Sequence, residues 1–384
     1  MVNQAVRIAQ SRATDAAQAV REFHAAVAQP EMELVIFFCS SEYDLEVVAA
    51  EMNHLFRGVQ VVGCTTAGEI GPAGYLEHSF AGASLAAGSF VAVSGLLEHL
   101  SEFEIAQGHD FAQDLLQRLE NKVSDPHAGN SFAMLMIDGL SVREEQVAYS
   151  LQGGLEKIKL FGGSAGDDRK YSKTHVFSDG HFHLGSAVLL LVNTVLPFKI
   201  FMTQHFVSTE QRLVVTEADP ARRIVKEING RPAAEEYARL LGVDVKELSR
   251  TRFADSPVVV VIGGMDYVRS IQKANPDGSL TFFCAIEEGV VLRMAHGRGL
   301  VQNLEQTFDK LQADIGSLQL VLGCDCILRN QELSQSGLKE RVGEIFRRNN
   351  IIAFSSYGEQ FHGVHVNQTF TGIAVGTSDR THDD

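Results

Sequence analysis

The stretch "FSSYGEQFHGVHVNQTFTG", residues 354–372, gathers several side chains that could hold a ligand. It carries the imidazoles of His362 and His365, the phenol of Tyr357 and the carboxylate of Glu359. A neutral imidazole is a common metal ligand, and it also transfers protons near neutral pH. Because His365 lies between two valines as an apolar strand begins, we expect its ring to sit beside the preceding loop.

Iron–porphyrin ligation is the metal chemistry that these histidines could support. A haem needs one axial side chain, commonly histidine, inside an apolar cavity that excludes water. His296 also follows an apolar strand, "VVLRMAH", and His362 is three residues from His365. We therefore rank His365 first as axial ligand, with His296 and His362 behind it. The alternative is that each is a hydrogen-bonded structural histidine.

Signatures of several common enzyme classes do not occur in the sequence. "GGSAGDD" at 162–168 lacks the Lys-Ser/Thr pair of a P-loop and the spacing of a dinucleotide-binding loop. No His-Glu-x-x-His motif is present. Cys324 and Cys326 have no second cysteine pair to complete a zinc site, which favours core packing. We expect a protein that is not an enzyme.

Three segments of the chain resemble one another and begin at Leu34, Phe132 and Leu318. Each reads as a buried strand, an amphipathic helix, a second buried strand and a loop of small residues. Ser141 and Glu144 have the spacing of a capping box at the start of the second helix. The predicted fold is α/β, with two domains and mixed sheets built from recurring strand–helix–strand units.

The loops that end these segments share a pattern of hydroxyl, variable residue, glycine and acid. The glycine could supply an unusual backbone dihedral while the acid binds loop amides. The recurrence also predicts a shared concave surface where the strands end. The three loops are Thr66-Ala67-Gly68-Glu69, Ser164-Ala165-Gly166-Asp167 and Ser356-Tyr357-Gly358-Glu359.

A different pattern separates the second and third segments. A strand and a helix are followed by a hairpin with Asp277-Gly278 in its turn. We place the boundary between the two domains near Thr216–Pro220. The predicted domains are therefore 29–215 and 216–376.

Composition restricts the classes of partner. The formal charge of −15 over 384 residues argues against a nucleic-acid partner, which needs a basic footprint. No apolar run reaches transmembrane length, and the N-terminus lacks the apolar core of a signal peptide. Five scattered cysteines do not form a disulfide framework. We expect a cytoplasmic protein without membrane contact; a homo-oligomer stays possible.

Six motifs in order resemble FIST-domain proteins, which join an N-terminal and a C-terminal FIST segment, over about Leu34 to Gly376. The family is described as a sensory ligand-binding module, and this chain is similar to its bacterial nitric-oxide-sensing members. That resemblance implies a stand-alone protein with haem b, nitric oxide as ligand and a partner sensor or hybrid histidine kinase linked to biofilm control. The motifs are "VVGCTTAGEI", "FGGSAGDD", "YVRSIQKANPDGSLTFFCAIEEG", "CDCILRNQE", "AFSSYGEQ" and "HVNQTFTGIAVG".

A second interpretation needs no metal. The chain could be a haem-free receptor module for a small polar metabolite such as an amino acid. The charged and amide side chains that would bind it are Glu69, Asp167, Arg269, Glu359 and Asn367.

Overall fold

The computed structural model describes residues 4–377, and tertiary contacts divide the chain into two compact units. Unit 1 holds Met1–Met202, Leu304–Val364 and Phe370–Asp384, and unit 2 holds Thr203–Asn303 and His365–Thr369. The predicted mixed α/β class is confirmed. The domain limits 29–215 and 216–376 stay a prediction, because they concern family segments and not contact units.

Three six-stranded sheets repeat one strand order, and apart from residues 203, 365 and 366 they lie in unit 1. Sheet 1 runs β1 (Val6–Ser11), β6 (Phe80–Ala86), β2 (Met32–Ser40), β3 (Gln60–Thr66), β10 (Val176–Ser178) and β11 (His181–His183). Sheet 2 runs β7 (Phe90–Leu97), β12 (Ala187–Thr194), β8 (Ser131–Ile137), β9 (Leu160–Ser164), β24 (Glu359–Phe361) and β25 (Val364–Val366). Sheet 3 runs β13 (Phe198–Thr203), β26 (Phe370–Gly376), β22 (Leu318–Cys326), β23 (Ile351–Ser356), β4 (Glu69–Gly71) and β5 (Gly74–Leu76).

The predicted strand–helix–strand units lie at the centre of these sheets. Strands β2 and β3, β8 and β9, and β22 and β23 are parallel pairs, as helix crossovers require. The crossover helices are α2 (Leu45–Leu55), α4 (Glu144–Gly154) and, in the third unit, α8 (Ile327–Gln335) with α9 (Lys339–Arg348).

Each repeat also begins with an edge strand and a helix that sequence reasoning did not include. The edge strands β1, β7 and β13 precede α1 (Ala16–Val27), α3 (Ile105–Glu120) and α7 (Leu300–Ile315), respectively. In the third repeat, residues 203–303 of unit 2 are inserted between β13 and the body of α7.

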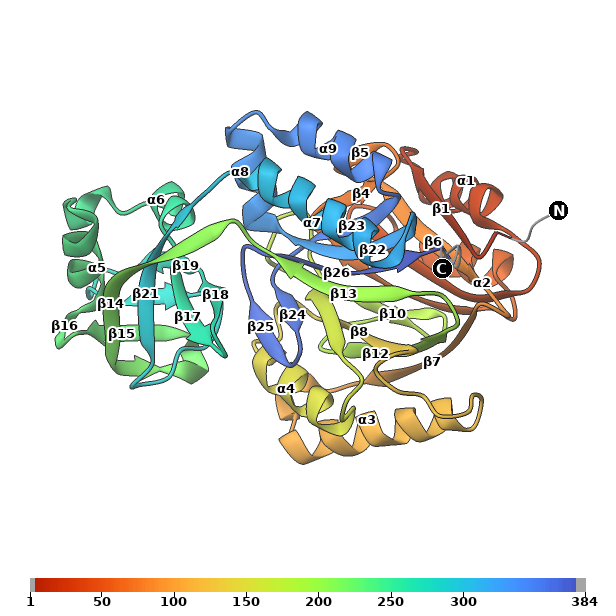
Figure 1. The fold of residues 1–384 in the computed structure, drawn as a ribbon, viewed down its shortest axis with the longest axis horizontal. Helices are drawn as coiled ribbons and strands as arrows, with labels where there is room; N and C mark the ends of the chain where they lie inside the picture. Colours follow the sequence, from red (N-terminus) through yellow and green to blue (C-terminus); the bar gives the residue numbers. More distant parts are fainter. Residues whose placement is uncertain (1–3, 378–384) are drawn as a thin grey trace, which may run out of the picture. The chain divides into compact units, whose positions relative to one another are not determined.

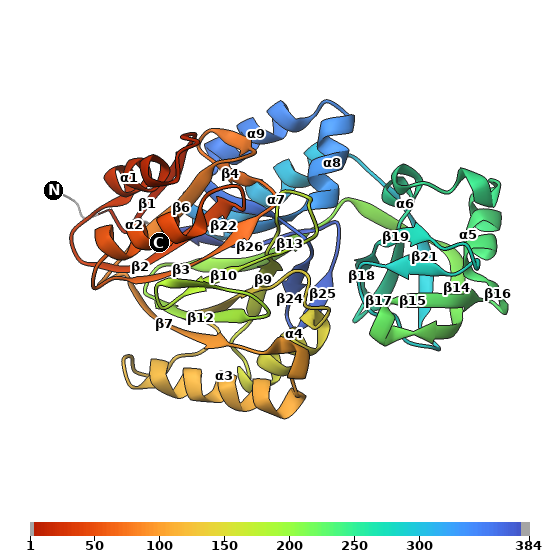
Figure 2. The same ribbon diagram turned by 180° about the vertical axis from the view of Figure 1, so that it is seen from behind.

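The three repeats exchange their hairpins in a cycle. Hairpin β4–β5 of the first repeat extends sheet 3, β24–β25 of the third extends sheet 2, and β10–β11 of the second extends sheet 1. Figure 2 shows β10 next to β3, which belongs to another repeat. Each sheet is therefore complete only when two repeats contribute to it.

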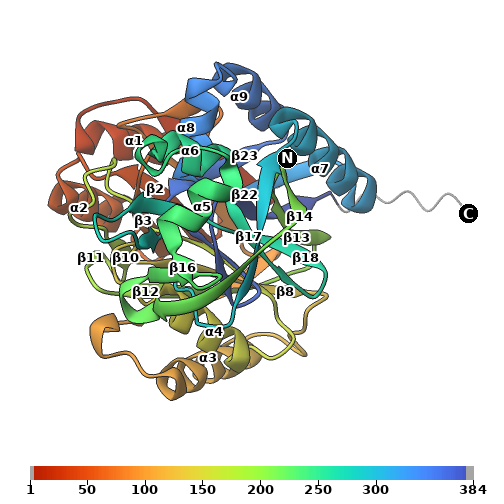
Figure 3. The ribbon, with the colours of Figure 1, turned by 90° about the vertical axis from the view of Figure 1, so that its left-hand side faces the viewer.

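The inner faces of the three sheets share one hydrophobic core. Phe38 of sheet 1 and Phe354 of sheet 3 are in ring contact, with centroids 4.5 Å apart, and Met134 of sheet 2 belongs to the same cluster. The helices cover the outside: α1 and α2 in red, α3 and α4 in yellow, and α7 to α9 in blue (Figures 1 and 3). A cysteine predicted to pack in the core, Cys324, does so.

The second crossover helix corrects one prediction. Its first residue is Glu144 and its N-cap is Arg143, which makes no side-chain cap hydrogen bond. Ser141 Oγ accepts from the amide of Arg143 at 3.3 Å instead. The capping box predicted from Ser141 and Glu144 is wrong, because the helix begins too late for Ser141 to be its N-cap.

Unit 2 is a sheet with two short α-helices and its own core. The predicted turn at Asp277-Gly278 is confirmed: Gly278 has a φ of +83°, and Ser279 N donates to Asp277 Oδ1 at 3.0 Å. The strands are β14 (Phe206–Asp219), β15 (Ile224–Ile228), β16 (Arg231–Pro232), β17 (Val258–Ile262), β18 (Met265–Arg269), β19 (Ile271–Ala274), β20 (Leu280–Phe282) and β21 (Val291–Gly297). The α-helices are α5 (Ala233–Leu241) and α6 (Arg250–Asp255).

Short 3-10 turns occur at Leu100–Glu102, Pro220–Arg222 and Val245–Glu247. Among residues 4–377, no helix is both long and apolar enough to cross a bilayer.

Candidate functional site

The three recurrent loops meet at the carboxyl ends of the parallel strands of unit 1. We call residues 66–69, 164–167 and 356–359 the loop cluster. Parallel strands commonly place ligand-binding residues at this edge. Backbone hydrogen bonds join each pair of repeats there, among them Gly166 N to Thr65 O at 3.0 Å, Ala67 N to Ser355 O at 2.9 Å, and Tyr357 N to Ser164 O at 3.1 Å.

Glu69 in the first loop is fully buried and bound by hydroxyl groups. Thr66 Oγ1 donates to one carboxyl oxygen, and Ser79 donates to the other from its amide at 3.0 Å and its hydroxyl at 2.7 Å. Burial raises the pKa of Glu69 to about 8, against these hydrogen bonds, which lower it. Glu69 therefore holds a proton at neutral pH and stabilises its own loop.

Glu359 in the third loop repeats this arrangement. Its side chain is fully buried, and Ser356 Oγ donates to it at 2.6 Å. The hydroxyl three residues before the acid thus binds the acid in both loops. This contact explains the recurring pattern as a way to close the turn.

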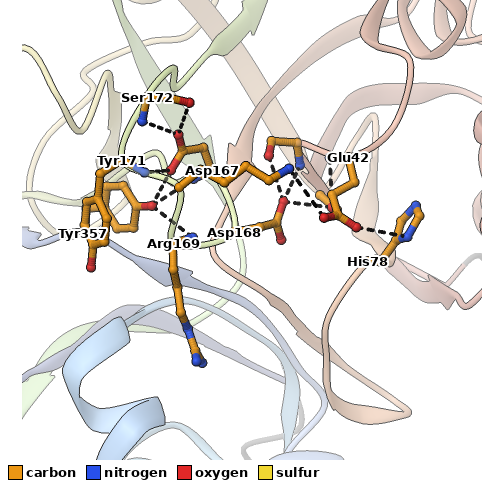
Figure 4. A network of polar contacts seen from close by, with 11 residues as sticks. Glu42, His78, Asp167, Asp168, Arg169, Tyr171, Ser172 and Tyr357 are labelled. Carbon is orange, nitrogen blue, oxygen red and sulfur yellow. Dashed lines mark hydrogen bonds and ion pairs between the residues drawn. The ribbon is translucent and has the colours of Figure 1, made fainter.

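Asp167 in the second loop has different partners. It accepts hydrogen bonds from the amides of Tyr171, Ser172 and Lys173 at 2.8, 2.6 and 2.9 Å (Figure 4). Burial opposes its ionisation, but hydrogen bonds from Tyr357 and these amides lower the pKa of Asp167 below its usual value. Asp167 is therefore an anion that organises the loop after it.

Tyr357 connects the third loop to the second by hydrogen bonds. Its hydroxyl donates to Asp167 Oδ1 and accepts from the amides of Asp167 and Arg169 at 3.3 and 3.1 Å. Its ring stacks on Tyr171 with centroids 4.6 Å apart, as Figure 4 shows. The phenol is thus engaged by protein groups on its face and at its hydroxyl.

Asp168 connects the second repeat to the first by hydrogen bonds. Ser40 Oγ, Ser41 N and Ser41 Oγ donate to its Oδ2 at 2.9, 2.9 and 2.8 Å. Nearby, Glu42 forms an ion pair with Lys170 at 3.4 Å, and His78 Nδ1 lies 3.4 Å from the other carboxyl oxygen of Glu42 (Figure 4). Loop positions in all three repeats are therefore linked by polar contacts.

His362 occupies the turn between β24 and β25, with a left-handed φ of +49°. Its half-buried ring stacks on Phe361 at a centroid distance of 3.8 Å. Burial, with a smaller effect of Lys159, lowers the pKa of His362 to about 4, so the imidazole is neutral at neutral pH. Its Nε2 is buried and has no hydrogen-bond partner among residues 4–377.

His365 and His296 belong to unit 2, whereas His362, Tyr357 and Glu359 belong to unit 1. His365 is buried, and its carbonyl oxygen accepts from Arg269 Nη1 at 2.9 Å. His296 is exposed in β21. The structure thus separates the predicted residues into two groups.

Most of the side chains that would bind a metabolite in the haem-free interpretation already form hydrogen bonds with other protein groups. Glu69, Asp167 and Glu359 bind their own loops, as described above. In unit 2, Arg269 Nη1 donates to the carbonyls of Val268 and His365, and Asn367 Oδ1 accepts from the amide of Ser270 at 3.4 Å.

Sequence reasoning missed Arg329 and Asn330, which follow β22 in the first turn and a half of α8. Both are buried, and Arg329 Nε donates to the buried Asp325 at 2.8 Å. The sequence did contain a signal in "CDCILRNQE", where an acid near the end of an apolar strand is followed four residues later by an arginine.

A pocket of about 290 Å³ lies elsewhere in unit 1, and its lining includes no residue predicted from the sequence. It is bounded by the end of α2, the start of β3 and the β10–β11 turn, with Asn53, Arg57 and Gln60 among its polar residues. Within residues 4–377, no three His, Cys, Asp or Glu side chains are grouped so as to hold a metal ion.

Comparison with protein families decides the identity at family level. Residues 33–231 match the FIST N domain and residues 233–362 match the FIST C domain. The chain belongs to the FIST family. FIST domains form sensory, ligand-binding modules, and this is the function that membership supports for the present FIST protein.

No curated protein matches the FIST chain. Among solved structures, a cyanuric acid hydrolase described as an innovation by structural concatenation is similar at 11% identity and a TM-score of 0.35. A chorismatase solved at 1.08 Å is similar at 8% identity and the same TM-score. Each alignment covers 97% of this chain and 99% of the other. Likeness at this level is too distant to bear on function.

Proposed function

We propose that this FIST protein is a sensor that binds haem b, responds to nitric oxide and regulates a partner histidine kinase without catalysing a reaction. The resemblance to nitric-oxide-sensing FIST proteins suggests this function. The observation that carries it is His362, whose half-buried imidazole occupies the turn between β24 and β25.

His362 has the properties that an axial ligand needs. A metal binds the neutral imidazole, and the lowered pKa keeps His362 neutral throughout the physiological range. Its Nε2 is buried and without a hydrogen-bond partner in the described part of the chain. We rank it ahead of His296, whose exposure does not exclude water, and the buried His365 stays a candidate for the axial role.

The hairpin also provides a route for a signal within unit 1. Strand β24 pairs with β9, and Gln360 Nε2 donates to Ser164 Oγ at 3.0 Å. A displacement of His362 would therefore be transmitted to the second loop of the loop cluster by the hydrogen bond between Gln360 and Ser164. Bound haem would supply the iron position at which nitric oxide binds.

Absorption spectroscopy tests this function. Haemin is titrated into purified protein, and nitric oxide is then added to the reduced complex. We expect a saturable Soret band that moves with nitric oxide, and loss or displacement of that band in His362→Ala. If the Soret band changes in His365→Ala but not in His362→Ala, then His365 is the axial ligand. Failure of the protein to take up haemin would refute the proposal.

A further inference from the structure

We propose that Arg329 and Asn330 form a buried binding site for a small carboxylate that bears a hydrogen-bond donor on the adjacent carbon. An α-hydroxy acid has this chemistry. The site lies wholly in unit 1 and uses none of the histidines proposed for haem, so either proposal can fail without the other.

The first step is the position of the guanidinium. Arg329 is fully buried, and its Nε donates to Asp325 Oδ1 at 2.8 Å. The second oxygen of Asp325 accepts from the hydroxyl of Tyr75 at 2.8 Å. Asp325 and Tyr75 thus hold the guanidinium by its Nε edge, and its two terminal nitrogens face away from this contact.

The second step is the state of those terminal nitrogens. Nη1 and Nη2 of Arg329 are both buried and have no hydrogen-bond partner among residues 4–377. An arginine cannot lose its charge, so burying these donors without an acceptor is unfavourable, and an acceptor that reaches them would bind strongly. Two adjacent guanidinium nitrogens match the two oxygens of a carboxylate.

The third step is the electrostatic surroundings. The positive end of the nine-residue helix α8, which begins two residues before Arg329, favours a nearby anion. Glu332, one turn further along α8, opposes it because its negative charge acts on the same guanidinium. Neutralising Glu332 should therefore strengthen binding.

The fourth step is Asn330, which is 2% exposed. Its Nδ2 donates to Ser355 Oγ at 2.9 Å, which fixes the orientation of the amide. Its Oδ1 is buried without a hydrogen-bond partner within the described ranges, and it can accept from a hydroxyl group. Arg329 would thus bind the carboxylate while Asn330 binds the neighbouring donor.

The site adjoins the loop cluster. A Cβ on Gly68 would lie 3.7 Å from Ser355 Oγ and 3.8 Å from Asn330 Nδ2, so the first loop packs directly on the asparagine. Ala67 of the first repeat forms a small apolar cluster with Ile327 and Tyr357 of the third, and Leu140 of the second packs against it. A short carbon chain suits these surroundings.

Isothermal titration of the dialysed full-length protein tests the site with three probes at equal ionic strength: lactate, propionate and phosphate. Propionate keeps the carboxylate but lacks the hydroxyl. We expect lactate to bind most tightly, propionate more weakly and phosphate weakest. No carboxylate binding at 10 mM, an order-of-magnitude limit for one strong ion pair, would overturn the site. Equal binding of phosphate would also overturn it, by showing a general anion site.

Matched variants assign the residues. Arg329→Lys keeps the charge but loses the paired nitrogens. It should therefore lower the affinity for both lactate and propionate at least about tenfold. Arg341→Lys, at a side chain 61% exposed, is the control and should bind as the wild type. Glu332→Gln should bind more tightly. Unchanged affinity in Arg329→Lys would overturn the proposal.

Asn330→Ala keeps the test decisive if Arg329→Lys does not fold. This variant should remove the advantage of lactate over propionate while propionate binding persists. A preserved advantage would contradict the role of Asn330, and with it the assigned class of ligand.

Discussion

The three acids of the recurrent loops occupy equivalent sequence positions but have different chemical surroundings. Glu69 and Glu359 each accept from the hydroxyl three residues earlier, whereas Asp167 accepts from three amides that follow it. The motif predicts that each acid binds loop amides, which Asp167 does with the amides that follow it, whereas Glu69 and Glu359 bind hydroxyls of their own loops. It does not distinguish them, because residues 168–173 form an extension whose path depends on Tyr357, about 190 positions away.

Glu69 should make stability depend on pH. Its folded-state pKa of about 8 lies above its ordinary value of 4.5, so between these values the folded protein keeps a proton that the unfolded chain releases. The free energy of unfolding therefore falls as pH rises through this window, by at most about 1.4 kcal/mol per pH unit. Glu69→Gln, which mimics the protonated acid, should remove this slope.

Urea denaturation at pH 5, 6, 7 and 8 measures the effect. We expect the wild type to lose stability relative to Glu69→Gln at each step upward. Glu120→Gln, at an exposed position, is the control and should follow the wild type. A difference that stays constant with pH would mean that Glu69 is ionised in the folded protein.

Tyr357→Phe tests the contact between the second and third loops. The change leaves the Tyr171 stack but removes the hydroxyl that donates to Asp167 and accepts from two amides. We expect a loss of about 1–3 kcal/mol in unfolding free energy, because buried partners lose a hydrogen bond. A loss below the error of chemical denaturation would show that the hydroxyl is not needed.

At the scale of elements, exchanged hairpins explain why the loops meet. Each loop leads from a parallel strand of its own repeat into a hairpin that pairs with another repeat. The chain must therefore pass close to a neighbouring loop three times. Local periodicity predicts strands and helices, but this pairing joins residues far apart in sequence, so the sequence pattern alone did not predict it.

Gly166→Ala tests the close packing of these loops. An added Cβ would lie 2.7 Å from Ala67 N, and the backbone cannot retreat without moving the first loop. We expect destabilisation of about 1–3 kcal/mol from overpacking. The control is Gly153→Ala in α4, where the nearest atom is 3.7 Å away; it should gain about 0.5–1 kcal/mol from helix propensity. Equal changes in unfolding free energy in Gly166→Ala and Gly153→Ala would contradict the close packing of these loops.

At the scale of the whole molecule, three complete repeats build unit 1, and unit 2 interrupts the third. Sequence comparison found the most similar part, the strand–helix–strand centre, because buried strands and amphipathic helices leave a strong pattern. It missed the edge strand and first helix of each repeat. In the third repeat these are separated by most of unit 2, so no continuous segment carries the full pattern.

The same scale limits what sequence could say about the site. His362 and Tyr357 were recognisable as candidates by residue type. Arg329 and Asn330 were not, because their significance lies in buried nitrogen and oxygen atoms without partners in the described chain. Only the folded arrangement of β22, α8 and the first loop reveals that condition.

The central claim, that this FIST protein senses nitric oxide through haem, is tested most directly by the absorption spectrum during haemin titration. The account predicts a saturable Soret band with one haem per chain, which moves when nitric oxide is added and is lost or displaced in His362→Ala. Tyr149→Phe, at a residue 67% exposed, should leave that spectrum unchanged. A protein that stays colourless after haemin addition and desalting would contradict the claim.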